Sequence, residues 1–433
     1  MSSPLLTAPI LPTLARLSAP GVLLVVFQTA VSVGDAYFIG RLGTAPLAGL
    51  ALVFPLVMLL QMSSAGAMGG GVSSAIARSL GAGDAVRARR LVVHALLIAL
   101  GMAVAFTLLI LAFGSPLYRV LGGEGESLAN ALAYSNILFG GCVTAWLANT
   151  LASVLRGSGN MLVPALGLIG AAIIQVPLSG GLVLGLGLGI AGAAIAYVLA
   201  FGLAALVMAV AVLRSRLCPT REDWRMDKRL FADILRVGGL SVLNAFQTVL
   251  TAMALTGFVG RFGAAALAGY GVGVRLELLQ IPLVFAVGQA LVVLVGTNIG
   301  AGNAARAKRI AWVGAAVAGA ICLVIGWSFA LLPLAWVGLF SADGAVLDAG
   351  TRYLHIAAPF YPLLGVSVAL YFASQGAGRM VMPVLAGTAR LVIVLLGGAA
   401  VVSLGAIFGV IALGFALQAA LMIWFVARTT WKK

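Results

Sequence analysis

The sequence predicts an all-α integral membrane protein whose twelve transmembrane helices form two parallel six-helix repeats related by a pseudo-two-fold axis along the membrane normal. Three observations predict this fold: the composition, a series of apolar runs and an internal repeat. Of the 433 residues, 62% are hydrophobic and only 9% are charged, whereas soluble domains carry about 25% charged residues. Twelve helices of about 20 to 25 residues, the length that a bilayer core requires, use most of such a chain. No separate soluble domain is expected.

The predicted spans are the apolar runs of the sequence, some of them separated only by Gly or Pro. They fall near residues 16–40, 46–72, 91–113, 128–155, 162–184, 190–213, 237–259, 265–297, 310–333, 349–374, 383–404 and 406–427. We therefore expect an N-terminal six-helix lobe at 1–213, a cytoplasmic linker at 214–236 and a C-terminal six-helix lobe at 237–433. The first run has no basic start or small-residue cleavage pattern, so it is predicted to be a retained helix.

The net charge of +15 is best explained by membrane topology. With a cytoplasmic N-terminus, 20 of the 26 Lys and Arg residues lie inside and four outside, while Arg275 and Arg390 fall within apolar runs. The positive-inside rule then predicts cytoplasmic termini in a bacterial-type inner (plasma) membrane. The basic residues predict contact with anionic lipid. They do not predict a nucleic-acid partner, because they are spread over several loops without interleaved aromatics. The linker is expected to be a solvated amphipathic connector.

The internal repeat has an offset of 220 residues that falls to 219. The segment FIGRLG at 38–43 returns as FVGRFG at 258–263, and LAG at 47–49 returns at 267–269. After a slip of one residue, GAGD at 81–84 returns as GAGN at 300–303. Each copy contains six spans, an even number, so both copies enter the membrane from the same side. Parallel repeats of this kind are expected to flank a central cleft.

Two acidic residues lie well inside apolar spans, Asp35 and Glu277. Burying an ionisable group in a membrane costs about 2.5 to 3.5 kcal/mol, which makes it a functional candidate. Asp35 shares a helix stripe with Gln28 and Ser32, and Leu255 stands at its repeat position, so packing symmetry does not require the acid. A carboxyl there can take up and release protons; the alternative is an interhelical hydrogen bond.

Glu277 could pair with Arg390 inside the C-terminal half or take part in substrate or proton binding. Its neighbour Arg275, two residues away, would not face it on a regular helix. The remaining predicted residues of the substrate cavity are Asn149, Gln175, Tyr197, Asn244, Gln247 and Arg275. For Asn149, Gln175, Asn244 and Gln247, an interhelical hydrogen bond is the alternative.

Cofactors are not expected. The three cysteines form no CxxC pair, and only His94 and His355 are available as bases or further ligands. A disulfide framework, a zinc site and a catalytic thiol are therefore disfavoured. An intramembrane enzyme is also disfavoured, because the sequence has no HExxH, GxSxG or paired aspartates.

The segment GDAYFIGRLG at 34–43, with Pro20 fifteen residues before Asp35, resembles the first helix of the multidrug and toxic compound extrusion (MATE) family. The Gly-rich turns at 157–164 and 376–383 are similar to that family, and RLE at 275–277 most resembles its DinF-like branch. The resemblance implies Asp35 as the coupling acid and Gln28 as a cavity residue. The sequence departs from the family pattern at Ala172 and Val176, before Pro177, and at Tyr197, where a Thr is common.

The resemblance implies a monomeric antiporter that exports amphiphilic, cationic compounds in exchange for protons by alternating access, and no enzyme. Sodium coupling is the alternative, although few carboxylates remain to coordinate a metal cation. A lipid-linked saccharide flippase of the same superfamily is a further alternative; a cleft lined by Arg would favour it. Expected partners are small-molecule substrates and the lipid bilayer.

Overall fold

The computed structural model describes residues 4–431, and all regular structure within them is helical. Eleven helices there are long and apolar enough to cross a membrane, and the pair Gly125–Gly140 and Val143–Gly157, bent by 47°, completes a twelfth span. The predicted all-α fold with twelve spans is confirmed.

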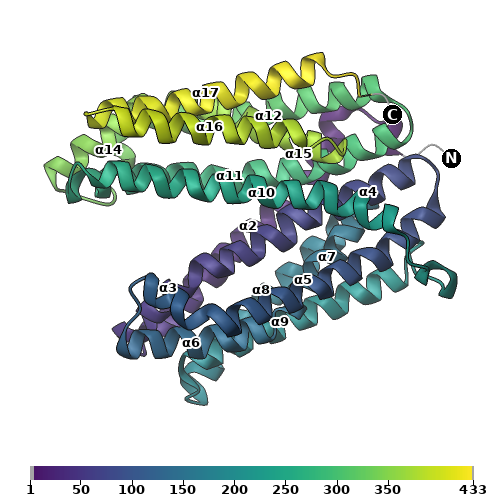
Figure 1. Cartoon of the computed structure of the whole chain (residues 1–433), viewed down its shortest axis with the longest axis horizontal. Helices are drawn as coiled ribbons and strands as arrows, with labels where there is room; N and C mark the ends of the chain where they lie inside the picture. The colour runs from purple at the N-terminus through teal and green to yellow at the C-terminus, as the bar shows by residue number, and fades with distance from the viewer. Residues whose placement is uncertain (1–3, 432–433) are drawn as a thin grey trace. The chain divides into compact units, whose positions relative to one another are not determined.

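The chain divides into two compact units, Ala19–Gly238 and a second unit that joins the N-terminal residues up to Ser18 to the chain from Gly239 onward. These boundaries differ from those of the sequence repeats, since they fall inside two long helices, α2 (Ile10–Gly40) and α10 (Lys228–Gly260) (Figure 1). The segment predicted as a linker belongs to the first unit.

The first unit contains, after α2, the helices α3 (Thr44–Gln61), α4 (Gly69–Gly81), α5 (Ala85–Val120), α6 (Gly125–Gly140), α7 (Val143–Gly157), α8 (Leu162–Gly180) and α9 (Gly189–Leu213), the π-helices η1 (Met62–Met68) and η2 (Gly181–Gly185), and the 3-10 turn η3 (Arg221–Trp224). The second contains α1 (Pro4–Thr7), α11 (Ala264–Gly300), α12 (Ala304–Leu331), α13 (Pro333–Val337), α14 (Gly344–Ala357), α15 (Tyr361–Gly376), α16 (Val381–Ala400), α17 (Leu404–Arg428) and the 3-10 turn η4 (Ala358–Phe360).

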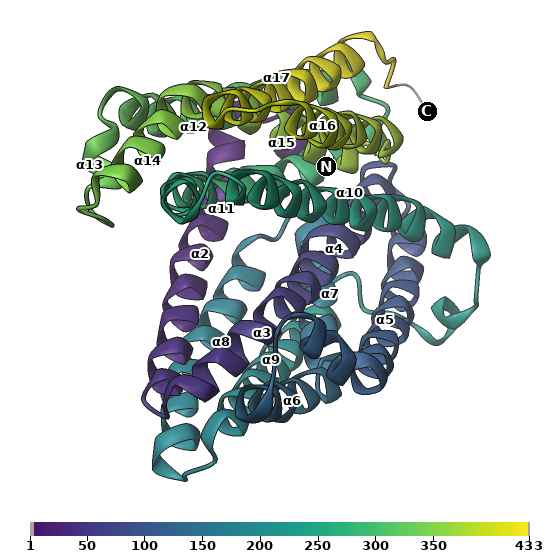
Figure 2. The same ribbon diagram turned by 60° about the vertical axis from the view of Figure 1, so that its left-hand side comes forward.

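The same packing occurs in both units. In the first, α3 packs on α6, α7 on α9 and α8 on α9; in the second, α11 packs on α14, α15 on α17 and α16 on α17. Figures 1 and 2 both show α16 and α17 side by side. The two halves are therefore structural copies, as the sequence repeat predicts.

Two equivalent glycines make the first of these contacts possible. A Cβ on Gly49 would lie 2.8 Å from Asn130 Cβ and 2.9 Å from the Ala131 nitrogen, and a Cβ on Gly269 would lie 2.7 Å from both Ala349 Cβ and the Gly350 nitrogen. Small residues allow membrane helices to approach closely where lipid provides no hydrophobic drive. The repeated LAG segments are thus explained by helix packing.

The one-residue slip in the repeat also has a structural cause. The continuous stretch Thr44–Gly81 has 38 residues, and its counterpart Ala264–Gly300 has 37. The longer stretch contains the π-helix η1, whereas α11 is α-helical throughout. A π-helix accommodates extra backbone in a widened turn, and such turns are frequent at functional sites.

Candidate functional site

Asp35 in α2 lies in a small buried polar cluster with two residues of α8. Its side chain is 8% exposed. Gln175 donates a hydrogen bond from Nε2 to Asp35 Oδ2 at 3.0 Å. Ser179, one turn further along α8, lies beside the same carboxyl, but its hydroxyl and Asp35 Oδ1 lack hydrogen-bond geometry to any group within residues 4–431. Buried polar atoms are normally paired, so this cluster can accept a proton or a polar ligand atom.

Close packing of α2 against α8 brings this cluster together. A Cβ on Gly34 would lie 3.2 Å from Val176 Cγ1, and a Cβ on Gly180 would lie 2.9 Å from Phe38 Cζ. A larger residue at either glycine would require Val176 or Phe38 to shift. The two glycines therefore allow the close approach of α2 and α8 at which the Gln175 amide reaches Asp35.

A second polar network lies at the π-helix η1 of the same unit. Asn149 of α7 donates from Nδ2 to Gln61 Oε1 at 3.1 Å and to Ser64 Oγ at 2.8 Å. Gln61 in turn donates to the Tyr197 hydroxyl of α9 at 2.7 Å. This network, which we call the amide network, connects the Gln61–Ser64 segment to two further helices and contains no charged residue.

The other predicted residues of α2 lie apart from these bonds. Gln28 and Ser32 are exposed within the described structure. Gln28 lies seven residues before Asp35, about two helical turns, so the two residues lie on the same side of α2, with Ser32 between them.

In the second unit, Gln247 of α10 donates from Nε2 to Thr388 Oγ1 of α16 at 2.7 Å. A Cβ on Gly387 would lie 2.8 Å from Gln247 Oε1 and 2.9 Å from Asn244 Oδ1. Gln247 thus makes an interhelical hydrogen bond to α16, and the Asn244 side chain lies close to the same helix.

Glu277 accepts a hydrogen bond from the Tyr353 hydroxyl at 3.3 Å, and Tyr361 donates to Tyr353 at 3.3 Å. Arg390 attracts the same carboxyl electrostatically, but the two lie beyond ion-pair distance. We call these four residues the tyrosine cluster.

The two arginines of the apolar runs have different surroundings. Arg275 is exposed and lies over the Phe340 ring, with Cζ 5.2 Å from the ring centroid. Arg390 donates to Gln418 Oε1 at 3.3 Å and lies 4.6 Å above Phe415. Arg275 thus lies apart from Glu277, as i and i+2 geometry predicts.

The predicted site residues form separate groups in the two units. Within residues 4–431, no group of three His, Cys, Asp or Glu side chains has the geometry to hold a metal ion.

The MatE family model matches residues 20–180 and 241–400, one match in each repeat. The chain belongs to the MatE family. The MatE chain is 28% identical to a protein of Shewanella oneidensis named FAD transporter, over 90% of this chain and 88% of the relative. It is 25% identical to the multidrug export protein MepA of Staphylococcus saprophyticus, over 82% and 79% of the two chains.

Solved structures have the same fold as this MatE chain. A MATE protein described in a bent conformation matches with a TM-score of 0.91 at 24% identity, over 98% of this chain and 96% of that one. A MOP superfamily transporter from Pyrococcus furiosus matches with a TM-score of 0.90 at 23% identity, over 98% of both chains. The predicted family is confirmed.

Sequence reasoning missed three residues of the MatE site: Gln61, Ser64 and Ser179. Ser179 follows Gln175 by four residues, so helical periodicity could have placed both on one face. Gln61 is the last residue before the π-helix η1, and Ser64 lies within it. The regular periodicity of an α-helix does not apply there.

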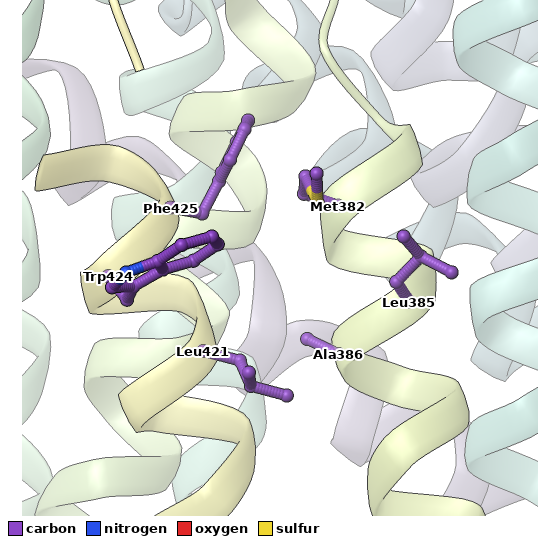
Figure 3. Close-up of a pocket in the computed structure, with 6 residues that line it drawn as sticks. All are labelled: Met382, Leu385, Ala386, Leu421, Trp424 and Phe425. Carbon is purple, nitrogen blue, oxygen red and sulfur yellow. The ribbon is translucent and has the colours of Figure 1, made fainter. Parts of the chain in front are cut away.

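The MatE chain also has an open apolar groove between α16 and α17 (Figure 3). It is lined by Met382, Leu385, Ala386, Leu421, Trp424 and Phe425. Its lining has no charged group and lies on the surfaces of two predicted spans, so it has the character of a lipid-facing surface.

Proposed function

We propose that this MatE transporter is a secondary antiporter that exports amphiphilic, cationic compounds in exchange for protons by alternating access. The observation that supports this most is the Asp35 cluster. It consists of a buried carboxyl with a single neutral donor, Gln175, and a nearby hydroxyl, Ser179. A carboxyl without an ion pair can exchange a proton without breaking a salt bridge.

The proposed coupling is mutual antagonism between protonation of Asp35 and binding of a cationic substrate. The ionised carboxylate attracts a cation, and the protonated acid does not. Negative coupling of this kind, typically about 1 to 3 kcal/mol, allows an inward proton gradient to drive export. The amide network offers neutral donors and acceptors that suit an amphiphilic substrate. We favour protons over sodium because few carboxylates are available to coordinate a metal cation, and Asp35 is the one carboxylate of this cluster.

The test uses the purified protein in liposomes. A pH gradient or a sodium gradient is imposed separately, and efflux of a fluorescent cation is followed. We expect efflux with the pH gradient only, and its loss in Asp35→Asn, which preserves size and the acceptor oxygen. The matched control is Asp348→Asn, an exposed carboxyl paired with Arg352, which should transport normally. Undiminished proton-driven efflux by Asp35→Asn would overturn the proposal.

Export of an anionic dinucleotide is a second candidate, favoured by the similarity to the relative named FAD transporter. Efflux of FAD and of a cationic dye from the same liposomes distinguishes the two. A cleft lined by Arg would favour the flippase alternative. The structure weakens the support from Arg390, which already contacts Gln418 and Phe415. The DinF-like branch, a monomeric state and cytoplasmic termini in the inner membrane remain part of the proposal.

A further inference from the structure

The segment that joins α9 to α10, predicted to be a solvated connector, is also attached to the end of α5 (Figure 2). Asp223 is only 2% exposed. Its Oδ2 accepts hydrogen bonds from the Thr220 backbone nitrogen and hydroxyl, both at 2.8 Å, and from Arg89 Nε of α5 at 3.1 Å. The turn η3 is therefore fixed by a buried ion pair and a capping box.

The chain beyond η3 is attached to α5 at every second residue. Arg90 donates from Nη2 to the Arg225 carbonyl at 3.3 Å. The Asp227 nitrogen donates to His94 Nε2 at 3.0 Å. Arg225 itself has an extended backbone, with φ −69° and ψ 121°. Residues 223, 225 and 227 thus make the contacts with α5. Asp223 does so through its carboxylate, whereas Arg225 and Asp227 do so through backbone groups, which leaves the Arg225 side chain exposed.

The residues between these attachments have large exposed side chains. Trp224 is 56% exposed and Met226 is 62% exposed. They are accompanied by four exposed basic side chains, those of Arg221, Arg225, Lys228 and Arg229, and by one exposed acidic side chain, that of Glu222, so the exposed charge is net basic. A Trp and a Met on a fixed backbone among basic groups form a surface with two kinds of affinity, apolar and cationic.

The position of this surface in the chain limits what can cover it. The preceding helix α9 ends at Leu213, the next helix α10 begins at Lys228, and both are candidate membrane spans. Only 14 residues separate them, so the segment stays next to the bilayer surface. Trp is enriched at the membrane–water interface, and juxtamembrane Lys and Arg are attracted to anionic lipid headgroups.

We propose that residues 221–229 form a lipid-binding anchor, in which Trp224 and Met226 enter the headgroup region of the adjacent leaflet and the four basic side chains bind anionic phospholipid headgroups. The contacts with α5 hold the two apolar side chains in place, so little ordering is required on binding. Binding of the segment between the two repeats to the bilayer then depends on the content of anionic lipid in that leaflet.

The test measures where the Trp224 side chain lies in a bilayer. Wild-type protein and Trp224→Phe are placed in nanodiscs of phosphatidylcholine with or without phosphatidylglycerol. The difference between their fluorescence signals isolates Trp224 among the seven tryptophans. With phosphatidylglycerol present, we expect quenching by lipids brominated near the headgroup and little quenching by aqueous acrylamide. Without it, bromolipid quenching should fall several-fold.

Two further variants complete the test. Trp424→Phe is the matched control, because Trp424 is 54% exposed on the apolar surface of α17 and its signal should be quenched in both lipids. Arg225→Gln combined with Lys228→Gln should remove the dependence on phosphatidylglycerol. Strong acrylamide quenching of Trp224 in phosphatidylglycerol discs would overturn the proposal and leave the surface free for a protein partner. An unchanged lipid dependence in the double variant would also contradict it. Neither measurement depends on transport.

Discussion

The contact between α11 and α14 makes a quantitative prediction for Gly269→Ala. The new Cβ would lie 2.7 Å from Ala349 Cβ, from the Gly350 nitrogen and from the Val346 oxygen. Favourable separations between carbon atoms are about 3.5 to 4.0 Å, and two of these three atoms belong to the backbone, so the helices must move apart. Overpacking typically costs about 1 to 3 kcal/mol. The better helix propensity of Ala offsets about 0.5 to 1 kcal/mol, which leaves a net loss of about 0 to 2.5 kcal/mol.

The measurement is thermal unfolding of the purified protein in detergent. Gly271→Ala is the matched control, because it lies two residues further along α11 and its Cβ would meet no atom within 4 Å. That variant should be as stable as the wild type or slightly more stable. Gly49→Ala, the repeat equivalent of Gly269→Ala, should lose stability as well. If Gly269→Ala melted at or above the temperature of Gly271→Ala, the packing argument would be refuted.

Three further predictions concern polar side chains. Burial alone would raise the pKa of Asp223, but hydrogen bonds and the guanidinium at this carboxyl hold its pKa below the usual range. The stability that this carboxylate contributes is therefore present above about pH 4 and is lost as the pH falls through the lower folded-state pKa. Asp223→Asn should mimic that loss, and trypsin should then cleave residues 214–236 faster at neutral pH. An unchanged cleavage rate would contradict the prediction. Tyr197→Phe removes the hydrogen bond from Gln61 and should cost about 0.6 kcal/mol, a typical value for membrane proteins, in the free energy of unfolding; a loss above about 2 kcal/mol would point to a wider role. Glu277→Gln and Arg390→Gln should be coupled by about 0.5 to 3 kcal/mol in a double-mutant cycle, whereas additive effects would mean that the two charges do not interact.

Fold and family could be predicted from the sequence because both leave regular patterns along the chain. Hydropathy gave the twelve spans, and the GAGD and GAGN turns identified the repeat. Asp35 was identifiable because a carboxyl in an apolar run is rare. These signals are local or periodic and depend on no particular packing of side chains.

Hydrogen-bond partners required the structure. Gln175 and Asp35 are 140 residues apart in the sequence, and Asn149 and Gln61 are 88 apart. Such pairs form only when particular helix faces meet. The attachment of the segment at Trp224 to α5 was not predicted for a similar reason, since its partners lie on a helix more than 130 residues earlier in the chain.

The π-helix Met62–Met68 has a consequence for how duplicated membrane proteins diverge. An added residue in a regular helix rotates everything beyond it by about 100° and would misalign every inherited contact. When one wide turn takes up the additional residue, the helix on either side keeps its register, and Gly49 and Gly81 remain equivalent to Gly269 and Gly300. The first repeat thus presents Gln61 and Ser64 at a widened turn, whereas the second repeat has a regular α-helix at the equivalent position. Removing one residue from this turn should convert the π-helix into a regular α-helix like that of α11.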